Sequence, residues 1–148
     1  MLKGIPLIIS PELLKILAEM GHGDELVISD AHFPAYSVGS QVVRADAVAS
    51  PEMMAAILKL IELDQYVEKP VAMMAPVPGD TVDPEIAAEC RAVLGKDADR
   101  IDYMERFAFY DRAKHAYAVV ITGESRKYGN ILIKKELHNR SFEYIYTV

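Results

Sequence analysis

The chain has 148 residues, of which 51% are hydrophobic, and its 22 acidic against 16 basic side chains give a formal net charge of −6. This length suits one domain with a continuous core, and the acidic balance lacks the positive field that holds nucleic-acid phosphates. A single cysteine cannot form an internal disulfide, the N-terminus MLKGIPLIIS lacks the apolar run of a secretory signal, and no segment approaches the roughly 18 apolar residues that span a bilayer. We therefore expect a cytoplasmic protein with no nucleic-acid or membrane partner.

The first helix and the first strand are separated by a histidine-glycine loop. Residues 10–12 (SPE) form a helix start, with a capping serine, proline at the first helical position and an acid near the positive end of the dipole. Apolar residues follow at helical spacing, and Gly21 is expected to close the helix in the left-handed conformation. Residues 26–28 (LVI) then form a short apolar run that is typical of a buried strand, so Asp30 stands at a strand end.

Helices and strands are predicted to alternate along the rest of the chain. The expected elements are a helix beginning at 50–52 (SPE), a strand at 71–77, a turn at 78–80, a helix from Asp83 to near Gly95, a strand at 101–105, a helix at 107–115, and strands at 118–121 and 131–135. This alternation predicts an α/β fold: a three-layer αβα single domain, 1–148, with a mixed or largely parallel central sheet. Ligands of such sheets bind beyond the strand ends.

The stretch EMGHGDELVISDAHFP contains the most distinctive polar residues. His22 lies between Gly21 and Gly23, which remove side-chain bulk on both sides and favour access over packing. Familiar nucleotide sites are excluded, because GESRKYGN lacks the lysine of a phosphate-binding loop and Leu26 stands where the dinucleotide fingerprint needs its third glycine. Cys90 is expected to be a buried, unreactive thiol.

Each remaining polar candidate has a structural reading as well as a functional one. Asp30 suits a turn, His22 suits a helix C-terminus, Arg106 suits a surface ion pair, and residues 128–130 (YGN) suit a turn into a strand. A zinc or manganese site would use two histidine-aspartate pairs as ligands, although their spacing gives this hypothesis little support. The four ligand candidates are His22, Asp24, Asp30 and His32. Together, the carboxylate, amide and guanidinium groups favour a hydroxyl-rich ligand, on which aromatic rings such as Tyr36, Phe107 and Tyr117 would pack.

Three segments resemble the ribose pyranase and fucose mutarotase family, and most closely its fucose mutarotase branch. They are LLKILAEMGHGDELVISDAHFPAYSVG, MMAPVPGDTVDPE and ERFAFYDRAKHAYAVVITGESRKYGNILIKK. The resemblance implies a sugar isomerase without metal or other cofactor, acting on L-fucose and also on ring forms of D-ribose. It implies His22 as proton donor and a sugar site formed by Asp30, Arg106, Tyr117, Tyr128, Gly129 and Asn130.

The resemblance also implies a homo-oligomer, a decamer of two stacked pentameric rings with sites near subunit boundaries. One departure is the C-terminal extension 136–148 (ELHNRSFEYIYTV), because the family usually ends soon after the strand ILIKK. Its apolar residues are expected to form an edge strand or to cover a subunit surface.

Mutarotation needs one acid and one base, and a histidine has both protonation states available near neutral pH. His22 is expected to protonate the ring oxygen, while Asp30, Tyr128 or bound water takes the proton of the anomeric hydroxyl. Two other classes stay open: a non-catalytic sugar-binding or regulatory module, and a metal-dependent sugar hydrolase or isomerase built on the histidine-aspartate pairs.

Overall fold

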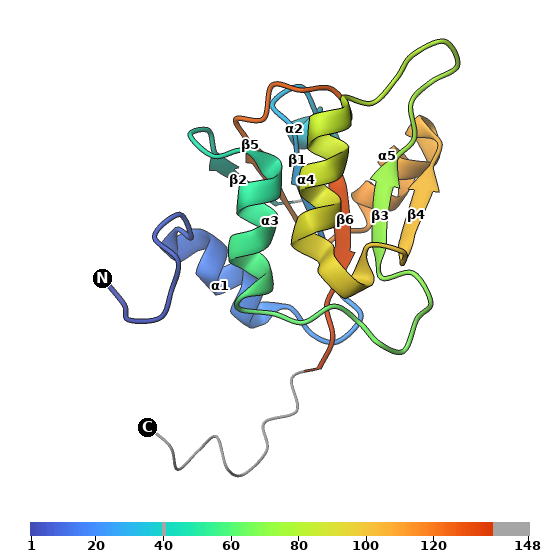
Figure 1. Cartoon of the computed structure of the whole chain (residues 1–148). Helices are drawn as coiled ribbons and strands as arrows, with labels where there is room; N and C mark the ends of the chain where they lie inside the picture. The colour runs from blue at the N-terminus through green and yellow to red at the C-terminus, as the bar shows by residue number, and fades with distance from the viewer. Residues whose placement is uncertain (40, 138–148) are drawn as a thin grey trace.

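The computed structural model describes residues 1–39 and 41–137. The chain forms three layers, with one central sheet between two layers of helices (Figure 1). The helices are α1 (Pro11–Glu19), α2 (Ala35–Val38), α3 (Ser50–Leu58), α4 (Pro84–Leu94) and α5 (Arg106–Lys114), with a 3-10 turn at Gly95–Asp97. The strands are β1 (Glu25–Ser29), β2 (Val42–Ala45), β3 (Val71–Met74), β4 (Ile101–Met104), β5 (Ala118–Thr122) and β6 (Ile131–Lys134). The predicted αβα single domain is thus confirmed, whereas residues 138–148 of the predicted extension lie outside the described residues.

The sheet is mixed, in the order β2-β5-β1-β6-β3-β4. The pairs β1 with β5, β2 with β5 and β3 with β4 are parallel, while β6 runs antiparallel to both β1 and β3. The parallel strands therefore end at one edge of the sheet, where β6 begins.

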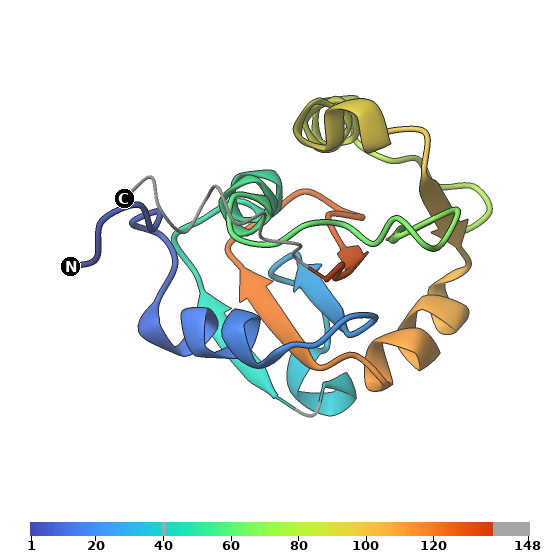
Figure 2. The ribbon, with the colours of Figure 1, turned by 90° about the horizontal axis from the view of Figure 1, so that it is seen from below.

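Two apolar clusters fill the space on the two faces of the sheet, because successive strand residues point to opposite sides. Leu26 and Ile28 of β1 pack on one face with α1, α3 and α4, while Val27 packs on the other face with α2 and α5. Figure 2 shows α3 and α4 on one side of the sheet and α5 and α2 on the other. No helix in the described part of the chain is long and apolar enough to cross a membrane.

Several local predictions are confirmed. Ser10 caps α1, its hydroxyl oxygen accepting the Leu13 N–H at 3.1 Å, and Pro11 is the first helical residue. Gly95 ends α4 with φ +56°. Cys90 is fully buried, and burial raises the pKa of its thiol to about 12.

Other local predictions are wrong. The left-handed glycine of the histidine loop is Gly23 (φ +87°), not Gly21, because Met20 already leaves the helix in an extended conformation. The helix predicted to begin at 50–52 does begin at Ser50, but this serine is the first helical residue and Ala49 is at the cap position, so the capping by Ser10 is not repeated here. Neither α2 nor β2 was predicted: α2 has only four residues, and β2 is a half-buried edge strand without a clear apolar pattern.

Candidate functional site

Asp30 lies directly after β1 and is fixed by backbone N–H groups. Its side chain is buried, at 3% exposure, and its two carboxylate oxygens accept the His32 N–H at 3.0 Å and the Gly129 N–H at 3.3 Å. Burial raises the pKa of the Asp30 carboxyl above its ordinary value of 3.8, although the N–H donors oppose this effect. The result is a well-oriented carboxylate that holds a proton more readily than an exposed one.

The turn 128–130 is packed against Asp30. The side-chain oxygen of Asn130 accepts the Asp30 N–H at 2.9 Å, so the strand end and the turn fix each other. Tyr128 has φ +62°, a left-handed conformation that is uncommon for a residue with a side chain. Gly129 leaves no room for a Cβ, because one built there would lie 2.8 Å from both the Glu124 Cγ and the Ile86 Cδ1.

Tyr128 reaches across to the loop that follows β3. Its hydroxyl donates to the Asp80 Oδ2 at 2.8 Å and accepts the Val77 N–H at 3.2 Å. The hydrogen bond from Tyr128, followed by one from the Thr81 N–H, holds the pKa of Asp80 below its ordinary value. The phenol oxygen therefore has a fixed position between two segments that are distant in sequence.

Arg106 is the first residue of α5, where Glu105 caps the helix by accepting the N–H groups of Phe107 and Ala108. The guanidinium group is exposed, lies 5.3 Å and 5.5 Å from the ring centroids of Phe107 and Tyr110, and donates to the Tyr110 hydroxyl at 3.3 Å. The Phe107 and Tyr110 rings hold the Arg106 guanidinium by cation–π contacts. Among the described residues this guanidinium forms no ion pair with a carboxylate.

These residues surround one cavity of about 540 Å³ at the edge where the parallel strands end. That size and position suit a small ligand bound beyond the strand ends. Of the predicted site residues, Asp30, Arg106, Tyr128 and Asn130 line it, and Gly129 contributes its N–H to Asp30. Sequence reasoning did not assign five further polar or aromatic lining residues to the ligand site: His32, Phe33, Asp80, Tyr110 and Lys127.

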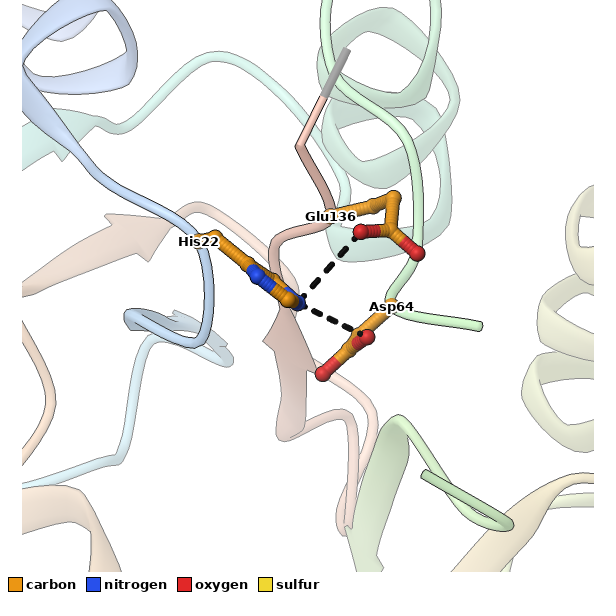
Figure 3. A group of neighbouring side chains, drawn as sticks. All are labelled: His22, Asp64 and Glu136. Carbon is orange, nitrogen blue, oxygen red and sulfur yellow. Dashed lines mark hydrogen bonds and ion pairs between the residues drawn. The ribbon is translucent and has the colours of Figure 1, made fainter. Parts of the chain in front are cut away.

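His22 lies at the other end of β1, away from this cavity. The five residues of β1 span about 16 Å between the loop of His22 and Asp30. The imidazole Nε2 of His22 lies 3.2 Å from the Asp64 Oδ1 and 3.3 Å from the Glu136 Oε1 (Figure 3). Tyr117 is also outside the cavity: it precedes β5, and its N–H donates to the Glu25 carbonyl at 2.8 Å.

The structure does not assemble the two histidine-aspartate pairs into one metal site. Asp24 accepts the Gly21 N–H, while Asp30 and His32 lie at the far end of β1 from His22. A different group, His22 with Asp64 and Glu136, has ligand atoms within 4.8 Å of one another. One imidazole and two carboxylates are a donor set that zinc or manganese accepts. Neither acid was predicted, since each is brought to His22 by a long-range strand pairing.

Comparisons with known proteins agree on one family. The family model described as the RbsD / FucU transport protein family matches residues 3–137. An L-fucose mutarotase of Actinobacillus pleuropneumoniae serotype 5b (strain L20) is 61% identical over 138 residues, which cover 91% of this chain and 96% of that protein. These two matches extend over almost all of the residues that the structure describes.

Solved structures show the same fold. The fucose mutarotase of Streptococcus pneumoniae, solved in complex with L-fucose, has a TM-score of 0.89 and 45% identity, covering 93% of this chain and 100% of that one. RbsD of Bacillus subtilis, solved with D-ribose, has a TM-score of 0.74 and 26% identity over 94% of this chain and 100% of that one. The chain therefore belongs to the RbsD / FucU family.

Proposed function

We infer that the chain is a mutarotase that interconverts the α and β anomers of L-fucose. The observation that carries this inference is the cavity at the strand ends, where Asp30, Arg106, Tyr128 and Asn130 converge. The relatives support the choice of sugar, because the mutarotase of A. pleuropneumoniae is named for L-fucose and the S. pneumoniae structure contains it.

Ring opening requires a proton delivered to the ring oxygen and a proton removed from the anomeric hydroxyl. Asp30 is the base that suits the second step, because burial raises the pKa of its carboxyl and two N–H groups fix its orientation. The side-chain oxygen of Asn130 accepts the Asp30 N–H, and this bond orients the amide so that its NH₂ group donates to a sugar hydroxyl. Arg106 supplies further donors at the exposed side of the cavity.

Tyr128 acts as a fixed acceptor in this scheme. Its hydroxyl hydrogen is directed to Asp80 and one lone pair accepts the Val77 N–H, which leaves one lone pair for a sugar hydroxyl. The phenol therefore orients the sugar within the cavity while Asp30 accepts the proton.

His22 supplies the other proton, and it does so from a second copy of the chain. Within one copy β1 separates His22 from the cavity, so a complete site needs the imidazole of a neighbour. We accordingly propose a homo-oligomer, a decamer of two pentameric rings as the family resemblance implies, with each site between two subunits. Exposed apolar side chains, including Leu7 at 80% exposure and Phe107 at 64%, provide surface for such contacts.

The test of this function is saturation transfer between the α and β anomeric protons of L-fucose, measured by NMR. The wild type should accelerate exchange, and His22→Ala should lower the enzymatic rate by about 10² to 10⁴, which is the usual contribution of a positioned acid or base. Lys15→Ala, an exposed change on α1, is the matched control. Wild-type exchange at the spontaneous rate would contradict the assignment as a mutarotase.

Two alternatives are tested in the same measurement. The D-ribose bound to the B. subtilis relative favours ribose as a second substrate, whose pyranose and furanose forms are followed by the same method. The family description names a transport protein, which favours a module that binds the sugar without exchange. Tight binding without acceleration would identify that module, and loss of exchange on chelation would identify a metal-dependent enzyme.

The cytoplasmic location and the independence from cofactors remain predictions of the sequence. Fractionation of the producing cell tests the first, and full exchange activity after exhaustive dialysis against a chelator tests the second.

A further inference from the structure

The imidazole of His22 is held by two buried carboxylates (Figure 3). The His22 side chain is 38% exposed, whereas those of Asp64 and Glu136 are only 4% and 7% exposed. Both acids face the same ring nitrogen, Nε2, at 3.2 Å and 3.3 Å. Two acids on one nitrogen are more than a chance surface ion pair would provide, because burying a carboxylate is costly unless it is hydrogen-bonded.

Backbone pairing fixes both carboxylates. The segment of Asp64 pairs with the end of β6: the Asp64 N–H donates to the Lys134 carbonyl, and the Glu136 N–H donates to the Glu62 carbonyl. The Asp64 Oδ1 also accepts the Tyr66 N–H at 2.9 Å, and the Glu136 Oε2 accepts the Gln65 N–H at 2.8 Å. The acids are therefore rigid before any substrate is present.

This arrangement determines which nitrogen of His22 carries the hydrogen. Burial opposes ionisation of Asp64, but hydrogen bonds from Tyr66 and His22 prevail and lower its pKa. An ionised carboxylate only accepts hydrogen bonds, so Nε2 must be the donor. The hydrogen bonds of His22 within the described residues all involve Nε2, which leaves Nδ1 for other partners.

We propose that Asp64 and Glu136 are positioning residues that keep the hydrogen on Nε2 of His22 and present Nδ1 to the sugar in the neighbouring cavity. This inference rests on the proposed function. Protonated Nδ1 gives its hydrogen to the ring oxygen, the bond from that oxygen to the anomeric carbon breaks, and the anomeric hydroxyl loses its proton to Asp30. The aldehyde rotates, and reclosure returns the first proton to Nδ1 and the second to the anomeric oxygen.

The groups around His22 come from several segments. Asp64 lies in the segment after α3, and Glu136 lies in the segment after β6. The centroid of the Tyr66 ring lies 5.1 Å from that of the imidazole, Asp24 lies in the loop of His22 itself, and Lys134 adds a positive charge beside Asp64. Removing either acid should therefore remove one acceptor for the hydrogen on Nε2.

The experiment compares Asp64→Asn, Glu136→Gln and the double variant with the wild type by anomer exchange of L-fucose from pH 5 to 9. We expect about a tenfold lower rate for each single variant and about 10² for the double variant, because carboxylate support of a catalytic histidine is part of its acid–base contribution. The rate should fall at saturating sugar with little change in KM, because the two acids contact the imidazole and do not line the sugar cavity. Asp46→Asn, which changes an exposed acid directly after the edge strand β2, is the control for net charge.

The outcomes separate this inference from the function on which it rests. If His22→Ala is inactive while both single variants keep the wild-type rate and pH profile, the positioning role is wrong and the mutarotase assignment stands. If the wild type does not accelerate exchange, the assignment itself fails. Should the variants not fold, neutron diffraction of the wild type decides: a hydrogen on Nε2 supports the inference, and a hydrogen on Nδ1 alone or a stoichiometric metal on Nε2 overturns it.

Discussion

The Asp30 side chain is buried although it carries a carboxyl group, and buried carboxyl groups are uncommon in proteins. Its environment raises the pKa of the carboxyl while the N–H groups of His32 and Gly129 hold it in place. The strand-end position was predictable from the apolar run before it. The raised pKa was not, because it comes from burial of the carboxyl, and the turn that packs against Asp30, with Gly129 and Asn130, follows about 100 residues later in the chain.

The raised pKa has a consequence for stability. A group whose folded-state pKa lies above its unfolded value stabilises the protein fully at pH below the unfolded value, and this contribution is lost as pH rises through the folded value. We expect the unfolding free energy of the wild type, relative to Asp30→Asn, to decrease as pH rises from about 3 toward neutrality. Urea unfolding of both proteins across this range measures the difference. A difference that grows with pH would contradict the raised pKa.

At the scale of elements, the turn between β5 and β6 is built around a glycine that has no space for a side chain. Gly129→Ala would press a methyl group against Glu124 and Ile86, so we expect a loss of about 1 to 3 kcal/mol in unfolding free energy and a higher KM for L-fucose. Urea unfolding and exchange kinetics measure the two effects. Gly21→Ala is the stability control, because its nearest new contact is an ordinary 3.6 Å. Equal stability of the two variants would contradict the close packing.

Most long elements were predictable because their caps and apolar spacing are local. Ser10 and Pro11 mark α1, Asp83 and Gly95 bound α4, and the apolar run of β1 marks a strand covered on both faces. The order of the strands and the antiparallel direction of β6 were not predictable, since they depend on pairings between distant segments. The supports of His22 were missed for the same reason, as Asp64 and Glu136 lie 42 and 114 positions away from it in sequence.

At the scale of the whole molecule, the two halves of the proposed site lie at opposite ends of the sheet. Co-expression of His22→Ala and Asp30→Asn subunits tests whether they meet between copies. Each variant alone should be inactive, whereas in a random mixture about a quarter of the subunit boundaries should join an intact histidine to an intact cavity. Anomer exchange of the purified mixed oligomer measures the recovery. A mixture as inactive as its parents would show that each site belongs to one subunit.

The opposed placement of imidazole and cavity also restricts how copies can associate. In the proposed oligomer each copy contributes one His22 and one cavity. An assembly in which every cavity receives the histidine of a neighbour must therefore be closed, either as a two-fold dimer or as a head-to-tail ring. An open linear assembly would leave one His22 without a neighbouring cavity at one end, and one cavity without a histidine at the other end. Closure is thus a requirement of the proposed shared site, and dilution that dissociates the oligomer should abolish anomer exchange.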